Sequence, residues 1–257
     1  MRERVHELIV SAGSWLIQRL ELVIAWGSRV GNPAFFDAPA HPGFAWTRNL
    51  EKQWEIIRDE LDAVLEHREL LPSFHDISKD QRRISDDRWK TYFFCAYGIN
   101  AEGNRDRCPE TSRLIDAIPG MMTAFFSILA PGKHIPPHRG PFKGVIRYHL
   151  GLVVPEPRAR CRIRVGTEIR HWEEGKGIMF DDTYEHEVWN DTPGTRVVLF
   201  LDVVRPLRFP ANLLNWLVLQ MIAHSPYIQD GAQNYRAWEK KLDQVGNARG
   251  RKEKVPA

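Results

Sequence analysis

The stretch "WEEGKGIMFDDTYEHEVWNDTPGTRVVLFLDV", residues 172–203, contains the pattern that decides the fold. It holds three short runs rich in β-branched and aromatic residues, "GIMFDD", "EHEVWN" and "TRVVLFLDV", with the turn signals "EEGKG" and "NDTPGT" beside them. Such residues favour strands, whereas Gly, Pro, Asn and Asp mark turns. The stretch therefore predicts closely spaced strands with no helix between them.

The same pattern extends upstream to about Arg88. It continues through "RWKTYFFCAYG", "MMTAFFSILAPG", "GVIRYHLGLVVP" and "RCRIRVG". Many short strands at this spacing are typical of a sandwich or barrel, and not of a parallel sheet with helices between its strands. We therefore predict a β core over residues 88–206.

Helical patterns flank this core. "TRNLEKQWEIIRDELDAVLEHREL", residues 47–70, places apolar residues on one helical face, and "ANLLNWLVLQMIAHS" and "NYRAWEKKLDQV" predict further helices after the core. We expect an N-terminal helical region, residues 1–87, to pack on the core. Residues 207–257 are expected to form C-terminal helices and a tail, and the chain is long enough for one sizeable domain overall.

The first thirty residues form another amphipathic pattern, with Trp15 and Trp26 near its apolar positions. Two interpretations stay open: a helix packed on the core, or one that lies on a membrane surface, where tryptophan is well suited to the boundary. No apolar run reaches the roughly 20 residues that span a bilayer. Arg19 and Glu21 also interrupt the first run, unlike a signal peptide.

Composition sets wide bounds. With 43% hydrophobic residues, 27% charged residues and a net charge of +3, the chain is typical of a soluble globular protein and gives no indication of nucleic-acid binding. The basic residues Arg162, Arg164 and Arg170 and the tail "RGRKEK" favour an anionic partner or surface, or are solvated surface charges. Three scattered cysteines suit reduced intracellular thiols. We expect a cytoplasmic protein, peripheral on the inner face of a membrane if the first helix is interfacial; the oligomeric state stays open.

Two of the ten histidines, His138 and His186, each lie at the edge of a predicted strand. Strands far apart in sequence can be neighbours in a jelly roll, so one metal ion could join them. Imidazole suits ferrous iron. Arg196 follows His186 across the turn "NDTPGT" and enters the apolar run "VVLFL". Unless it is exposed, it needs an anionic partner, and an acid co-substrate such as 2-oxoglutarate would supply a carboxylate.

"PGKHIPPHRGPFKGVIRYHLGLVVP", followed by the stretch at 172–203, closely resembles the aspartyl/asparaginyl β-hydroxylase family of Fe(II)- and 2-oxoglutarate-dependent dioxygenases. The strong match covers about residues 120–206, and "RWKTYFF" looks like the family's upstream strand. The resemblance implies a mainly β fold, a cupin-like double-stranded β-helix (jelly roll), with flanking α-helices.

The resemblance also implies individual roles. His138 and His186 look like the two iron ligands. Arg196 and Ser127 resemble the pair that holds the distal carboxylate of 2-oxoglutarate, and His149 resembles the group beside its metal-binding end.

Three further positions complete the predicted site: Arg147, Gly140 and Asp182. Arg147, on the same strand face as His149, looks like a contact for a substrate carboxylate. Gly140 is the third position of an H-x-G motif that begins at His138. The animal peptide hydroxylases of the family resemble this chain in having H-x-G, whereas the bacterial lipid A hydroxylase branch typically has H-x-D. Gly140 offers no ligand, and Asp181 and Asp182 are the nearest acids that could compensate for the missing carboxylate. We favour Asp182, which would accept a hydrogen bond from a metal-bound water. The alternative is that both acids belong to a solvated turn before His186.

Four functions stay open. The first is hydroxylation of the β-carbon of an Asp/Asn-type substrate, free, carrier-bound or in a peptide, with O2 as co-substrate. The second is lipid A-type hydroxylation of an acyl chain at a membrane surface, which the apolar "LLNWLVLQMIAHSPY" favours and Gly140 opposes. A halogenase, suggested by the small residue at 140, and a catalytically silent binding module are the others.

Overall fold

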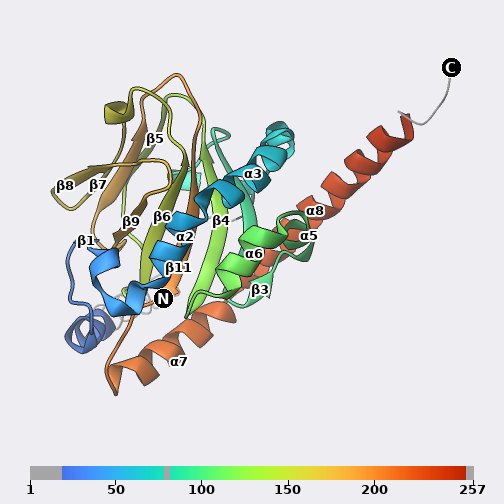
Figure 1. Ribbon diagram of the computed structural model, residues 1–257. Coiled ribbons are helices and arrows are strands. Elements are labelled where there is room, and N and C mark those ends of the chain that lie inside the picture. The colour runs from blue at the N-terminus through green and yellow to red at the C-terminus, as the bar shows by residue number, and fades with distance from the viewer. Residues whose placement is uncertain (1–18, 78–81, 253–257) are drawn as a thin grey trace, which may run out of the picture.

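The computed structural model describes residues 19–77 and 82–252 (Figure 1). Within these ranges two antiparallel sheets face each other. The larger has the strand order β1 (Phe35–Phe36), β9 (Gly177–Phe180), β6 (Val145–Val153), β11 (Arg196–Val204), β4 (Met121–Leu129), β2 (Trp89–Ala96) and β3 (Ile99–Asn100). The smaller has the order β5 (Lys133–His138), β10 (His186–Asn190), β7 (Cys161–Val165) and β8 (Glu168–His171).

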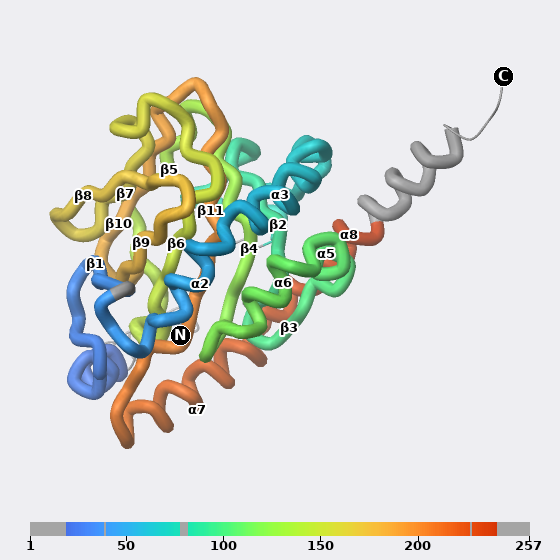
Figure 2. Tube along the Cα trace, viewed as in Figure 1, coloured from blue at the N-terminus to red at the C-terminus, as the bar shows by residue number. Residues whose placement is uncertain are grey.

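From β4 onward the chain passes back and forth between these sheets. β4, β6, β9 and β11 belong to the larger sheet, and β5, the β7–β8 hairpin and β10 belong to the smaller one. The path can be followed along the tube in Figure 2. This alternation is the double-stranded β-helix, so the predicted fold is confirmed.

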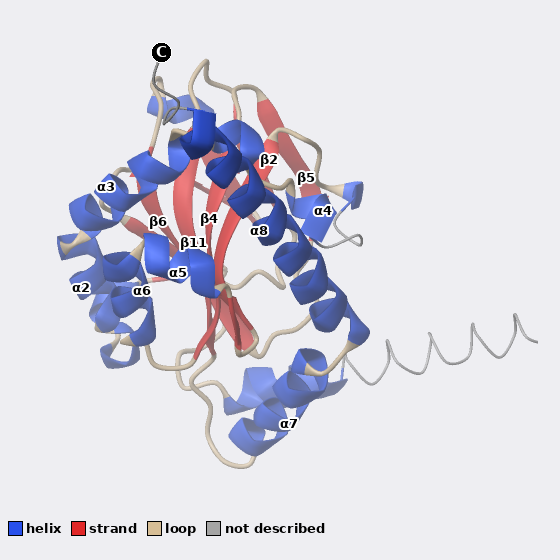
Figure 3. Ribbon diagram, turned by 90° about the vertical axis from the view of Figure 1, so that its right-hand side faces the viewer, coloured by secondary structure: helices blue, strands red, loops and turns tan. Residues whose placement is uncertain are grey.

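Four helices, α2 (Trp46–Lys52), α3 (Trp54–Leu65), α5 (Glu102–Arg107) and α6 (Pro109–Asp116), lie on the outer face of the larger sheet (Figure 3). Two others, α4 (Phe74–Ile77) and α8 (Pro226–Lys252), contribute apolar residues to the cluster between the sheets. The helix α7 (Ala211–Ala223) packs with residues 19–27 at one end of the molecule. The single helix expected over residues 47–70 is instead two helices, α2 and α3, separated at Gln53. The strands β1, β5 and β8 and the helices α4, α5 and α6 were not expected at their positions in the chain.

Strand alternation divides the apolar residues between two cores. Ile128, Leu150 and Leu199 point outward and pack with Ile57 and Leu61 of α3. Their neighbours on the opposite face of the strands fill the space between the sheets; they include Phe125, Val198, Phe200, Ile163 and Val188. Four polar residues share this inner face. Ser127 and His149 pair with the inward-facing Val198 and Phe200, and Arg147 and Arg196 each lie two residues from an inward-facing residue of their own strand.

Residues 19–27 are helical and pack against α7 through Ile24. In the part of the chain that the structure describes, no helix is both long and apolar enough to cross a membrane. Trp15 of the predicted amphipathic pattern lies outside the described residues, and Trp26 lies within them.

Candidate active site

The register of the smaller sheet brings His138 and His186 together. His186 at the start of β10 is paired with His138 at the end of β5, and their ring centroids are 4.1 Å apart. The Nδ1 atom of His138 lies 2.8 Å from the Pro136 carbonyl, and that of His186 lies 3.0 Å from the Tyr184 carbonyl. Donation from Nδ1 to these carbonyls fixes the tautomer and leaves each Nε2 lone pair available for a metal.

Both rings are held neutral, which is the form that binds a metal. Burial lowers the pKa of His138, and it lowers the pKa of His186 to about 3 with help from the neighbouring His138 and Arg147. Among the described residues, no group of three or more His, Cys, Asp and Glu side chains lies close enough to hold a metal ion. Two imidazoles on facing strand ends fit a metal that keeps several positions open.

The Asp182 carboxylate occupies the space beside Gly140. A Cβ atom on Gly140 would lie 2.6 Å from Asp182 Oδ1 and closer still to its other carboxyl atoms, and the Gly140 N–H donates to the Asp182 carbonyl at 2.7 Å. Oδ2 of Asp182 lies 3.0 Å from the guanidinium of Arg147, and Oδ1 has no partner within the described chain. Burial raises the pKa of Asp182 to about 6 against the opposing effect of Arg147. A carboxylate thus stands near His138 without being attached to position 140.

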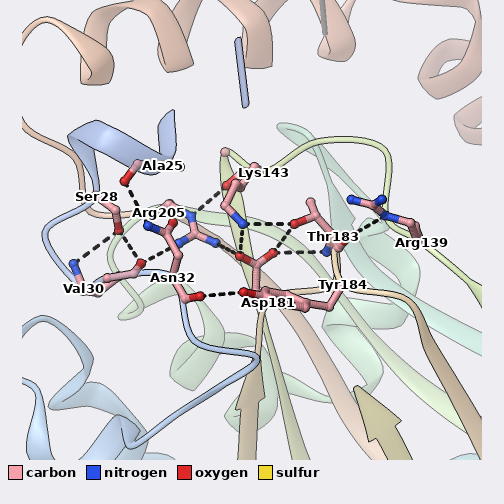
Figure 4. Close-up of polar contacts among 12 residues, drawn as sticks. Ala25, Ser28, Val30, Asn32, Arg139, Lys143, Asp181, Thr183, Tyr184 and Arg205 are labelled. Carbon is pink, nitrogen blue, oxygen red and sulfur yellow. Dashed lines mark hydrogen bonds and ion pairs between the residues drawn. The ribbon is translucent and has the colours of Figure 1, made fainter. Parts of the chain in front are cut away.

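Asp181, the residue before Asp182, belongs to a buried polar network (Figure 4). Its Oδ2 accepts hydrogen bonds from Arg205 and Lys143, each at 2.6 Å, and its Oδ1 accepts from the Thr183 hydroxyl at 2.6 Å. Arg205 also donates to the carbonyl of Gly31 at 3.1 Å. The network therefore ties the turn before His186 to the N-terminal segment. No sequence motif marked Arg205 or Lys143.

Arg147 lines the same region but is already paired. It donates to both carboxylate oxygens of Asp202, at 2.8 and 3.0 Å, and lies over the Phe200 ring at 4.3 Å. Together with Asp182 this gives the guanidinium two carboxylate partners from its own chain. A substrate carboxylate at Arg147 would have to compete with them. Sequence reasoning missed Asp202, although an acid inside "VVLFLDVV" was a signal.

Deeper between the sheets lies a set of polar groups without partners. Arg196 is 1% exposed, and its Nε and one terminal nitrogen have no hydrogen-bond partner among the described residues. Neither ring nitrogen of His149 has one, nor does the indole N–H of Trp172, whose ring lies 4.7 Å from the Arg196 guanidinium. Ser127 accepts a hydrogen bond from the Trp89 indole at 3.1 Å and can still donate.

A buried, unpaired guanidinium is costly unless a ligand neutralises it. Burial lowers the pKa of Arg196 to about 10, which still leaves it charged at neutral pH. A small dicarboxylate fits these donors, with one end at Arg196 and Ser127.

A cavity of about 220 Å³ leads to His138, Arg147 and Asp182. Most of its wall is apolar and comes from α4, β2, β4 and α8. The wall includes Phe74, Ile77, Trp89, Phe93, Phe125 and Ile228.

The fold and the site define the class: a double-stranded β-helix protein with a histidine pair at the end of an apolar cavity. Residues 51–206 match the family model described as aspartyl/asparaginyl beta-hydroxylase. The chain therefore belongs to this family, as its motifs indicated, and it is a hydroxylase.

Individual relatives are similar over different lengths. The chain is 46% identical over 228 residues to the ornithine lipid ester-linked acyl 2-hydroxylase of Rhizobium tropici, covering 86% of this chain and 80% of that protein. It is 34% identical over 166 residues to the human aspartyl/asparaginyl beta-hydroxylase, covering 62% of this chain but only 21% of the human protein. It is 31% identical over 221 residues to mouse aspartate beta-hydroxylase domain-containing protein 2, covering 79% and 61% respectively.

Proposed function

We propose that the protein is an Fe(II)- and 2-oxoglutarate-dependent dioxygenase that hydroxylates the acyl chain of a lipid at the inner face of a membrane. The apolar wall of the cavity carries this proposal, because Phe74, Phe93 and Phe125 suit a hydrocarbon chain and exclude water from the histidine pair. Support comes from the Rhizobium tropici relative, whose name specifies a lipid acyl chain and whose similarity spans most of both proteins.

His138 and His186 would hold the iron, and Arg196 with Ser127 would hold the distal carboxylate of 2-oxoglutarate, with His149 near its other end. Iron, 2-oxoglutarate and O2 together supply the oxidising chemistry for an unactivated C–H bond. The protein's own groups position these ligands and shield them from water. Arg196 neutralises a carboxylate in a buried place, and the unpartnered Oδ1 of Asp182 can accept a hydrogen bond from water beside the histidines.

An Asp/Asn-type substrate is the second candidate. Arg139 and Arg236 line the cavity, and either cation would suit a substrate carboxylate. The identity to the human aspartyl/asparaginyl beta-hydroxylase favours it as well.

A substrate screen separates the two. The protein, loaded anaerobically with Fe(II) and 2-oxoglutarate, is exposed to O2 with dispersed bacterial lipids or with Asp- and Asn-containing peptides. Succinate formation above the substrate-free rate, with one added oxygen atom on a lipid acyl chain by mass spectrometry, is the expected result. Hydroxylated peptide with unmodified lipid would overturn the lipid assignment. A chlorinated product would indicate a halogenase, and absence of Fe(II) and 2-oxoglutarate binding would indicate a silent binding module.

A further inference from the structure

Large apolar side chains are exposed mainly in two segments of the protein. Of the ten that are exposed among the described residues, eight lie on helix 19–27 or between Phe209 and Met221. Trp26 is 72% exposed, Phe209 76% and Met221 65%. We call these eight the apolar face; its members are Leu22, Val23, Trp26, Phe209, Leu213, Trp216, Leu217 and Met221.

The two segments form one continuous surface because they pack on each other. The Arg29 N–H donates to the Pro206 carbonyl at 2.9 Å, and the Arg208 N–H donates to the Gly27 carbonyl at 2.8 Å. Gly27 also lies against Ala211, the first residue of α7. Below the surface, both segments contribute to one buried cluster. Figures 1 and 2 show the N-terminal helix and α7 at the same end of the molecule.

The outward side of α7 is unusual for a helix in contact with water. Val218 and Leu219 are buried, yet the exposed side carries Leu213, Leu217 and Met221. A surface helix normally presents polar residues to solvent, and one that is apolar all round is covered by something.

Charge at this face points to an anionic surface. Residues 203–229 and 22–36 contain no Asp or Glu, whereas Arg29 and Arg208 are both exposed there. A symmetric contact with a second copy would place two surfaces that both carry these exposed cations against each other, which is unfavourable. Anionic lipid headgroups attract them, and Trp26 and Trp216 are suited to the boundary between headgroups and acyl chains.

The face also adjoins the cavity. Tyr97 packs against the buried cluster beneath the face and lines the cavity, and Phe142 of that cluster follows Pro141, a cavity residue. The chain runs from α7 into α8, which contributes Ile228 to the cavity wall. A surface that docks through α7 would therefore lie close to the cavity.

We propose that the apolar face docks on an anionic lipid bilayer, so that α7 and helix 19–27 lie in the headgroup region. One part of this proposal rests on the proposed function, namely that an acyl substrate would enter the neighbouring cavity from the same bilayer. Arg29 and Arg208 add attraction, and the apolar side chains supply the insertion.

The test is sedimentation of the full chain with phosphatidylcholine vesicles that contain or lack phosphatidylglycerol. We expect binding to the anionic vesicles. The double variant Trp216→Ser/Met221→Ser should weaken it by at least about tenfold, because two large apolar side chains no longer enter the bilayer. Ile169→Ser is the matched control, since Ile169 is 52% exposed on β8, outside the face, and should bind like the wild type.

Equal vesicle binding by the double variant and the wild type would overturn the proposal. A second result would also overturn it: light scattering shows a dimer of the wild type but not of the double variant, and neither protein binds vesicles. The face would then be an interface between copies. Turnover of a detergent-dispersed lipid by the double variant should stay near the wild-type rate. Vesicle binding without hydroxylation of any lipid would refute the proposed function and leave this docking surface intact.

Discussion

Replacing Gly140 by alanine should disturb the protein through Asp182. A methyl group at position 140 would overlap the Asp182 carboxylate, lying 2.6 Å from Oδ1 and closer to the other carboxyl atoms. The carboxylate has little room to move, since it is 1% exposed and Arg147 lies 3.0 Å away on another side. Gly140 does not have a positive φ angle, so the backbone itself accepts alanine. The collision is therefore the main cost.

Forcing an extra carbon into a well-packed buried site typically costs 1–3 kcal/mol, so we expect Gly140→Ala to lower the free energy of unfolding by about 2 kcal/mol. In an Asp182→Ala background the colliding carboxylate is absent, and the same substitution should cost less than about 0.5 kcal/mol. The coupling energy of the double-mutant cycle is then about 1.5 kcal/mol or more.

Urea unfolding of the wild type, both single variants and the double variant, followed by circular dichroism, measures this coupling. Gly231→Ala is the control, because the nearest atom to a Cβ there is the Ile77 carbonyl oxygen at 3.6 Å and alanine suits helix α8. Additive costs in the cycle would refute the overlap. Gly140→Asp should inactivate the wild type for the same reason. Combined with Asp182→Ala, it returns a carboxylate to the same space and should restore part of the activity.

His138→Ala or His186→Ala should each abolish Fe(II) binding in calorimetry and succinate formation, and substantial turnover in either variant would remove that residue from the metal site. Arg196→Met should raise the 2-oxoglutarate requirement at least about tenfold, yet stabilise the ligand-free protein by about 1 kcal/mol or more in urea unfolding, because it removes an unpaired buried charge; a less stable variant would contradict this. Burial lowers the pKa of His138, His149 and His186, so below about pH 6.5 the unfolded chain binds protons that the folded metal-free protein does not. As the pH is lowered, the free energy of unfolding should therefore decrease by up to about 1.4 kcal/mol per pH unit for each histidine. The raised pKa of Asp182, about 6, opposes this decrease below pH 6, because there the folded protein binds a proton that the unfolded chain does not. Unfolding curves at several pH values, compared with those of His149→Phe, should show a shallower dependence in the variant; the same slope in both would exclude His149 as a buried neutral group.

Most strands of the core were predictable because their runs of β-branched and aromatic residues carry the signal locally. The strands β5, which contains Pro136 and Pro137, and β8, which is exposed throughout, were not among the predicted runs. The N-terminal strand β1 was not either, since Phe35 and Phe36 stand in a stretch rich in Pro and Gly and acquire strand geometry only by pairing with β9. The break between α2 and α3 at Gln53 was missed for a similar reason: the apolar spacing continues through it, and only packing on the sheet reveals it.

In the candidate site, the sequence predicted the residues next to strand ends but not the side chains with which the site residues pair. His138, His186 and Arg196 stand beside recognisable runs. The pairing of Arg147 with Asp202 depends on the register of β6 against β11, which no short window of sequence specifies. Arg205, after β11, reaches Asp181, after β9, across the intervening strand β6, so this contact exists only once the larger sheet has formed.

The Asp182 carboxylate explains how a glycine can stand at position 140. Arg147 lies between Asp182 and Asp202 and neutralises one of these two carboxylates, while Arg196 is a cation with no anion of its own among the described residues. Among these four groups the two cations and two anions cancel, and the neighbouring Asp181, Arg205 and Lys143 together add one positive charge. Charge alone therefore does not exclude an acid at position 140, whereas space does: a side chain there would overlap the Asp182 carboxylate. Asp182 thus places, from the neighbouring turn, a carboxylate beside the position where an H-x-D sequence would attach one to β5, and a second carboxylate would not have the space.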